Sequence, residues 1–244
     1  LNTYVSLDDP GRLKDQMYKE FKSIFGLSHA ENNCAVEEGY KALDVFLERK
    51  LRDPARQLLK QLEEEQRVGI VLLGRPYHND PGLNHGILEE FQKRGYPIFT
   101  QYSLPTNPEI LDKLFAEDIA SGRIAHPTDI SDVWQVSYSE NSSHKIWVAK
   151  YVARHPNLVG LDLSSFKCGH DAPIYTVVEE ILENSGTPYF SFKDLDENKP
   201  TGSIKLRIET IDYFLRRYRE DTLGNNKAYK VASAEEIDSE LVAG

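Results

Sequence analysis

Residues 67–100 constrain the fold more than any other stretch of this chain. An almost unbroken apolar run over 68–73 is rich in β-branched residues and ends at Gly74. A run without polar–apolar alternation is typical of a strand buried on both faces, as in a parallel sheet. A loop dense in Pro, Gly, Asn and His follows, and a helix is predicted to begin near Asn84 as its N-cap. With a second strand over 97–100, the stretch predicts one βαβ unit.

The rest of the chain extends this pattern into an α/β fold. Apolar periodicity, capping residues and helix stops predict helices over 10–26, 30–50, 53–66, 107–122, 143–155, 173–186 and 203–219, and strands over 158–163 and 188–192. This order predicts a mostly parallel sheet of at least four strands with flanking helices, Rossmann-like or flavodoxin-like. We expect a helical N-terminal segment over 1–66 that packs on the core, an α/β domain over 67–220, and a weakly ordered tail over 221–244.

Composition narrows the classes of function and the compartment. The 244 residues carry a net charge of −10, which argues against a nucleic-acid surface. No apolar run is long enough to span a membrane, and the polar first twenty residues predict no signal peptide. The only two cysteines, Cys34 and Cys168, predict no disulfide framework and hence a reducing cytoplasm. Cys34 lies among apolar residues of a predicted helix, which favours burial.

The loop after the first strand is the first candidate site. It places Arg75, Tyr77, His78, Asn84 and His85 just before a predicted helix N-terminus. Free backbone N–H groups and an arginine at that position suit a phosphate or a carboxylate. The loop follows neither dinucleotide-binding nor Walker spacing, so the pattern alone names no nucleotide. The alternative is a rigid turn in which Pro and Gly serve only the backbone geometry.

The loop after the 158–163 strand is the second candidate site. Cys168 follows Lys167 and precedes a helix start, and both features favour the thiolate form that binds metals. A nucleophile or a plain strand-end residue remains the alternative for this cysteine. Because both loops leave the carboxyl ends of sheet strands, we expect them to line one cleft.

Three segments resemble a known family. Residues 74–87, GRPYHNDPGLNHGI, resemble a signature of the acyl-CoA dehydratase activase-related proteins, which are related to the activator of 2-hydroxyglutaryl-CoA dehydratase. Residues 153–160, ARHPNLVG, and 166–171, FKCGHD, are similar to a second block of that family. The likeness extends over about residues 10–220. Lys167 and His170 stand where the family has Gly and Pro.

The resemblance implies a non-ATPase domain that is similar to dehydratase and benzoyl-CoA reductase subunits. Such a domain would support electron transfer or partner docking in 2-hydroxyacyl-CoA dehydration or acyl-CoA reduction, in anaerobic metabolism. Its partners would be ATPase activase modules or dehydratase and reductase subunits, with acyl-CoA as a ligand and a homodimer as one form. The resemblance also implies that Cys168 ligates an iron–sulfur cluster.

Two cysteines cannot supply the four thiolates of a complete [4Fe–4S] cluster, so a cluster would be shared between chains or incomplete. No catalytic residue is assigned from the sequence. Two alternatives stay open beside the implied role. One is a module that binds CoA or another anion without catalysis, and the other is a purely structural interaction domain.

Overall fold

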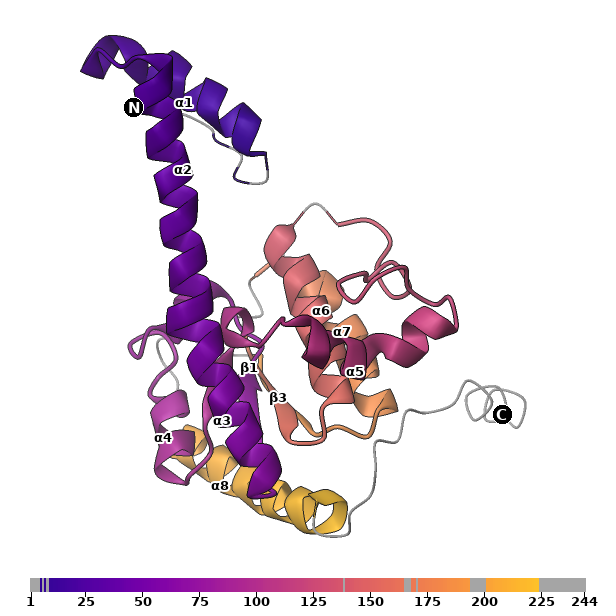
Figure 1. The fold of residues 1–244 in the computed structure, drawn as a ribbon. Coiled ribbons are helices and arrows are strands. Elements are labelled where there is room, and N and C mark those ends of the chain that lie inside the picture. Colours follow the sequence, from indigo (N-terminus) through magenta and orange to yellow (C-terminus); the bar gives the residue numbers. More distant parts are fainter. Residues whose placement is uncertain are drawn as a thin grey trace. The chain divides into compact units, whose positions relative to one another are not determined.

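The computed structural model describes residues 5, 7, 9–137, 139–164, 168–169, 171–193 and 201–223 (Figure 1). The helices are α1 (Pro10–Phe25), α2 (His29–Val45), α3 (Asp53–Glu64), α4 (Ile87–Lys93), α5 (Pro108–Ala120), α6 (Glu140–Arg154), α7 (Tyr175–Asn184) and α8 (Thr201–Tyr218). Shorter 3-10 turns are η2 (Pro76–Asn79), η3 (Gln101–Ser103) and η4 (Ala172–Ile174), and π-helical turns are η1 (Phe46–Arg52) and η5 (Arg219–Leu223). The strands are β1 (Gly69–Leu72), β2 (Ile98–Thr100), β3 (Leu158–Leu163) and β4 (Tyr189–Phe192).

The described chain forms two compact units that divide between Pro54 and Ala55, whereas the sequence pattern places a division at 66. The difference arises from α3, whose Leu59 and Leu62 belong to the same apolar cluster as Val71 of β1. The first unit is built on α1 and α2. Asp9 caps α1, and Ser28 and Glu31 form a capping box at the start of α2.

All four strands of the second unit are parallel and lie in the order β2-β1-β3-β4. This confirms the predicted α/β fold with a parallel sheet. Every residue of β1 and β3 is buried, because these central strands are covered on both faces. One face packs against α3, α5, α6 and α7, and the other packs against α4 and α8.

Three sequence expectations are wrong in detail. The helix after β1 begins at Ile87 with Gly86 as its N-cap at φ 70°, and Asn84 lies outside it. The helix expected at Ser143 begins at Glu140, where Ser139 accepts a hydrogen bond from the Ser142 N–H. Cys34 is exposed on α2 rather than buried, since the apolar side of that helix falls on other residues.

The long connection between α5 and α6 is fastened to α6. The Nζ of Lys150 donates to the Asp129 carbonyl at 2.9 Å and to the Asp132 carboxylate at 2.6 Å. The indole Nε1 of Trp147 donates to the Pro127 carbonyl at 3.0 Å. These bonds give a polar loop fixed partners on a buried helix, on which Trp147 is itself buried. Tyr138 in this connection is outside the described residues, as are 194–200 and 224–244, which include most of the predicted tail.

Candidate functional site at the carboxyl edge of the sheet

The strand order creates a switch point between β1 and β3. From β1 the chain passes through α4 to β2 at one edge, and from β3 it passes through α7 to β4 at the other. Because α4 and α7 lie on opposite faces of the sheet, the loops after β1 and β3 diverge at their carboxyl ends. In open α/β sheets this is the usual position of ligands. Both loops that the sequence singled out begin here.

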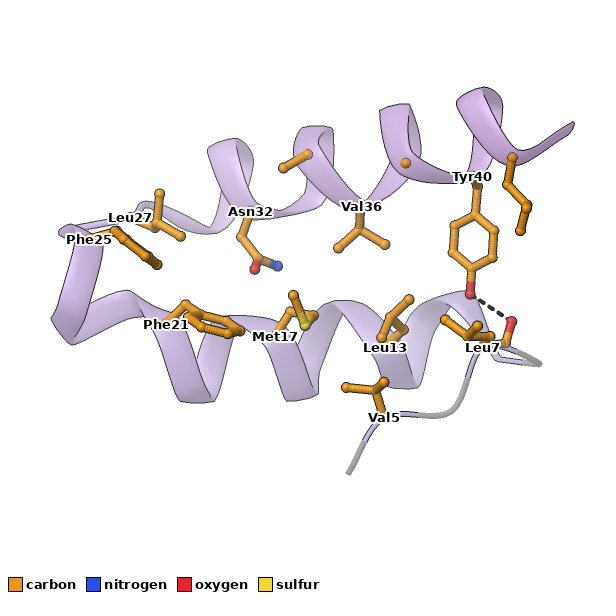
Figure 2. Close-up of a pocket in the computed structure, with 13 residues that line it drawn as sticks. Val5, Leu7, Leu13, Met17, Phe21, Phe25, Leu27, Asn32, Val36 and Tyr40 are labelled. Atoms are coloured by element: carbon orange, nitrogen blue, oxygen red, sulfur yellow. Dashed lines mark hydrogen bonds between the residues drawn. The ribbon is translucent and has the colours of Figure 1, made fainter. Parts of the chain in front are cut away.

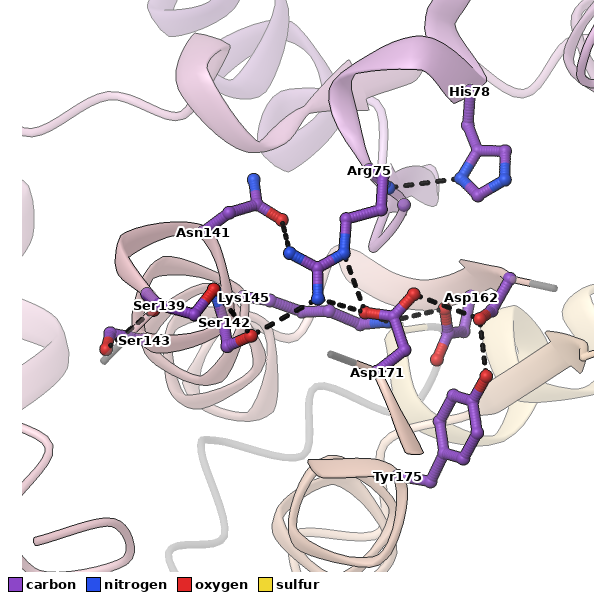
Figure 3. A network of polar contacts seen from close by, with 12 residues as sticks. Arg75, His78, Ser139, Asn141, Ser142, Ser143, Lys145, Asp162, Asp171 and Tyr175 are labelled. Atoms are coloured by element: carbon purple, nitrogen blue, oxygen red, sulfur yellow. Dashed lines mark hydrogen bonds and ion pairs between the residues drawn. The ribbon is translucent and has the colours of Figure 1, made fainter. Parts of the chain in front are cut away.

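A buried ion pair joins the two loops (Figure 3). The guanidinium of Arg75 contacts the Asp171 carboxylate through Nε at 2.9 Å and Nη2 at 2.8 Å. It also donates to Asn141 Oδ1 at 2.7 Å and to Ser142 Oγ at 3.2 Å, both on α6. The Arg75 side chain is 9% exposed and that of Asp171 is 0% exposed. The anion held by Arg75 in this structure is therefore an internal carboxylate.

A second buried pair lies beside the first. Lys145, which is fully buried on α6, donates to Asp162 Oδ1 at 2.8 Å and lies 3.8 Å from Asp171. Tyr189 donates its hydroxyl to Asp162 Oδ2 at 3.0 Å. The buried cluster thus contains two cations, Arg75 and Lys145, and two carboxylates, Asp162 and Asp171. Removing one of the four would leave an uncompensated charge in a buried environment.

The environment shifts the two carboxyl groups in opposite directions. Burial raises the pKa of Asp162 above its ordinary value, although Lys145 acts against this shift. Burial also acts to raise the pKa of Asp171, but Lys145 and Arg75 outweigh it and the pKa lies below its ordinary value. Asp171 further accepts a hydrogen bond from Ser164 Oγ at 3.0 Å, so it is the ionised centre of the network.

The buried side chains of His78 and Asn84 hold the backbone of the loop after β1 through hydrogen bonds. His78 is 3% exposed, and its Nδ1 accepts the backbone N–H of Arg75 at 3.0 Å. Burial lowers the pKa of His78 to about 4, so the ring is neutral near pH 7. Asn84 is 1% exposed and donates to the His78 carbonyl at 3.1 Å. A Cβ at Gly74 would lie 2.9 Å from His78 Nδ1, which explains the glycine at that position.

Tyr77 and Cys168 bring the two predicted sites together at the surface. Tyr77 is 47% exposed, and Cys168 is half-buried. The pKa of Tyr77 is raised first by burial and then by the neighbouring Cys168 and Asp171. His85 is half-buried in the left-handed conformation at φ 55°. The structure thus brings Arg75, Tyr77, His78 and Cys168 together, with Asn84 behind His78. Lys167 and His170 are outside the described residues.

The donor set does not fit a complete cluster within one chain. Over the described part of the chain, no group of three or more His, Cys, Asp or Glu side chains is arranged to hold a metal ion. Cys34 belongs to the other compact unit. Four thiolates are normally needed for a [4Fe–4S] cluster, and the chain has two cysteines.

The first unit carries an apolar groove (Figure 2). It has a volume of about 480 Å³ and runs between α1 and α2. Its lining includes Leu13, Met17, Phe21, Phe25, Val36 and Leu43. Phe25 is 65% exposed and Leu43 is 43% exposed. Near one end of the groove, Tyr40 donates its hydroxyl to the Leu7 carbonyl at 2.7 Å.

Residues 1–104 match the sequence profile of a family described as the CoA enzyme activase uncharacterised domain. This match covers 104 of the 244 residues and supports the resemblance of the chain to acyl-CoA dehydratase activase-related proteins. The matched segment contains the apolar groove, β1, β2 and the loop with Arg75, and it includes residues 74–87, which carry the first resemblance. The block at 153–171 lies beyond it.

No curated protein and no solved structure matches this chain. Over its described residues, no helix is both long and apolar enough to cross a membrane.

The sequence analysis missed the partners that organise the site. Lys145, Asp162 and Tyr189 received no role, and Asp171 was noticed only as part of a motif. One signal was present: Asp162 interrupts an otherwise apolar strand. A carboxylate inside a fully buried strand requires a cation or hydrogen-bond donors, and a lysine on a helix that covers the sheet is a suitable partner.

Proposed function

We propose that this chain is a non-ATPase part of an acyl-CoA dehydratase activase-related protein and that it works by docking a partner. The reaction supported by this docking would be 2-hydroxyacyl-CoA dehydration or acyl-CoA reduction. The observation that carries the proposal is the apolar groove between α1 and α2, which lies wholly within the family-matched segment.

The groove suits an amphipathic helix of an ATPase activase module. Its lining is apolar, its two walls are helices, and large side chains such as Phe25 remain exposed. Helix-in-groove recognition uses this geometry, with apolar anchors spaced three or four residues apart. The unit that ends at Pro54 is small and leaves large apolar side chains such as Phe25 and Leu43 exposed, and a partner helix would cover them.

The carboxyl-edge network supports docking over an independent redox role. The charges of Arg75 and Lys145 are balanced by Asp162 and Asp171, and this fixes the two loops relative to each other. Tyr77 and Cys168 stand at the rim of that rigid support. Electron transfer by this chain would require cluster ligands from a partner, because its own donor set is incomplete.

The direct test is calorimetric titration of the full chain with a purified ATPase activase module of this family. Phe25→Asp places a charge in the groove and should weaken binding at least tenfold. Ser23→Asp introduces the same charge on the same helix, at an exposed residue outside the groove lining, and should bind like the parent. Circular dichroism checks that both variants keep their helices.

Equal affinity of the two variants would reject the groove as the docking surface, and no binding by the parent chain would reject docking to that module. A parallel titration with CoA and acyl-CoA addresses the competing role as a ligand-binding module. Heat with acyl-CoA and none with the activase module would favour that competing role.

A further inference from the structure

A cavity of about 630 Å³ lies at the amino edge of the sheet, away from the network around Arg75. Three connections of the second unit meet there: the segment before β1, the segment before β2, and the end of α8 with η5. α4 and α8 pack together in this region, as Figure 1 shows. The volume falls in the range of about 300–1,000 Å³ that is usual for small-molecule sites.

Four arginines line this cavity: Arg67, Arg94, Arg216 and Arg219. They come from all three connections, and Glu220 is the single carboxylate in the lining. The chain as a whole has a net charge of −10, so a gathering of four guanidinium groups runs against its overall charge. Glu65, Glu90 and Asp212 each pair with one of the four arginines, so an anion would bind through the guanidinium N–H groups that these pairs leave over.

Neighbouring groups hold the two arginines on the strand side of the cavity. Arg67 contacts Glu65 through Nη1 at 2.7 Å and donates from Nη2 to the Gly95 carbonyl at 2.8 Å. Arg94 donates from Nη1 to the Glu90 carbonyl at 3.0 Å and contacts its carboxylate at 3.2 Å. Nε and Nη2 of Arg94 donate no hydrogen bond to any described residue.

The two arginines of the α8 end are held in a similar way. Arg216 pairs with Asp212 through Nε at 3.3 Å and Nη2 at 2.8 Å. Arg219 donates from Nε to the Gln66 carbonyl at 2.8 Å, and its two Nη groups donate to no other described residue. Each guanidinium is thus positioned by part of its donors and keeps others for a ligand. Such preorganisation lowers the cost of binding.

Tyr96 adds a fixed aromatic ring to the lining. Its hydroxyl donates to Asp212 at 2.8 Å, the same carboxylate that holds Arg216. Burial, followed by this hydrogen bond, raises the pKa of Tyr96 to about 12, so the phenol stays neutral and keeps donating. One carboxylate therefore orients both an aromatic ring and a guanidinium at the cavity.

We propose that this four-arginine cavity binds a ligand with two or more phosphate groups. Guanidinium groups pair with phosphate through two parallel N–H···O bonds, and several of them together favour a multiply charged ligand over a single carboxylate. The shared chemistry is a diphosphate, which inorganic pyrophosphate, ATP and CoA all contain. The proposal is independent of the groove between α1 and α2 and does not require a docking partner.

The test is calorimetric titration of the full chain with pyrophosphate, ATP and CoA, at low and at physiological salt. We expect binding of at least one of them, at an affinity that falls as salt rises. Arg219→Gln and Arg94→Gln should each weaken binding at least tenfold. Arg217→Gln removes the same charge from an exposed neighbour that does not line the cavity, and should leave binding unchanged.

Comparing the affinities of the three ligands shows which diphosphate compound the cavity prefers. Equal affinities would show that the phosphates alone are recognised, and tighter binding of ATP or CoA would assign the site to that ligand. No binding of any of the three at low salt would overturn the proposal. An equal loss in Arg217→Gln and Arg219→Gln would also overturn it, because the attraction would then be nonspecific.

Discussion

Arg75 and Asp171 form an ion pair across the carboxyl edge of the sheet, although 96 residues separate them in the chain. Nη2 of Arg75 lies 2.8 Å from Oδ1 of Asp171, and neither side chain is more than 9% exposed. The pair ties the loop after β1 to the loop after β3. It therefore couples the two segments that resemble different blocks of the activase-related family.

Asp171→Ala should destabilise the protein strongly. It leaves Arg75 buried without its carboxylate and removes one of the two negative charges near Lys145, which is expected to cost about 3–5 kcal/mol of unfolding free energy. Urea denaturation measures this. Arg75→Met combined with Asp171→Leu should cost less than Asp171→Leu alone, because the double variant buries no unpaired charge from this pair.

Glu179→Gln is the control for that measurement. Glu179 and Lys193 form a pair in which the side chains are 40% and 37% exposed, and such pairs contribute little. A loss in Glu179→Gln as large as that in Asp171→Ala would contradict the assignment of a special role to the buried pair.

Acidification should destabilise the fold through His78. Its pKa is about 4 in the folded protein and 6.5 in an ordinary environment, so the unfolded chain takes up a proton that the folded chain resists. The contribution of His78 to the free energy of unfolding is therefore fully present above pH 6.5 and is lost as the pH decreases towards 4. At about 1.4 kcal/mol for each unit of pKa, the loss from this group is at most about 3 kcal/mol.

His78→Gln should flatten that dependence, measured as the difference in unfolding free energy between pH 7 and pH 4.5. His126→Gln alters an exposed loop histidine and should keep the parental slope. A proton titration of His78 near 6.5 by NMR would show that the ring is not held neutral, contrary to this prediction.

The sheet could be predicted from the sequence because its two central strands are almost entirely apolar. The run over 68–73 is apolar without alternation, and the segment 158–163 is nearly so, which specifies strands buried on both faces. In the structure these segments become β1 and β3, the two fully buried strands. Helix spacing in between then predicted the crossovers, and the parallel order followed.

The side-chain partners were less predictable because they depend on tertiary contacts. Asn84 suits an N-cap by residue type, but its side chain is used to hold the His78 carbonyl, and Gly86 begins the helix instead. Arg75 precedes a predicted helix start, which suggests that it binds an external anion. Only the fold shows that its guanidinium is already paired with the Asp171 carboxylate. Local sequence patterns carry no information on which distant carboxylate will meet an arginine.

Gly69→Ala should destabilise the second unit by overpacking. A Cβ at Gly69 would lie 2.7 Å from Phe99 Cε2 and 2.8 Å from Leu62 Cδ1, and both neighbours are fully packed in the core. Forcing a methyl group into such a core costs about 1–3 kcal/mol. Gly202→Ala is the control, because nothing lies within 4 Å of its added Cβ. Thermal unfolding should shift to lower temperature in Gly69→Ala and stay close to the parent in Gly202→Ala.

Iron analysis decides between docking and an electron-transfer role that this chain carries alone. With two cysteines on separate compact units, we expect protein purified without oxygen to contain well under one iron and one acid-labile sulfide per chain. Cys168→Ser should leave that content and the absorption spectrum unchanged, and Cys34→Ser serves as its control. Two to four irons per chain or per dimer, lost in Cys168→Ser and retained in Cys34→Ser, would instead make Cys168 a ligand of a cluster completed between chains. The carboxyl edge around Tyr77 would then be the redox surface, and the proposed docking groove would have to act beside it.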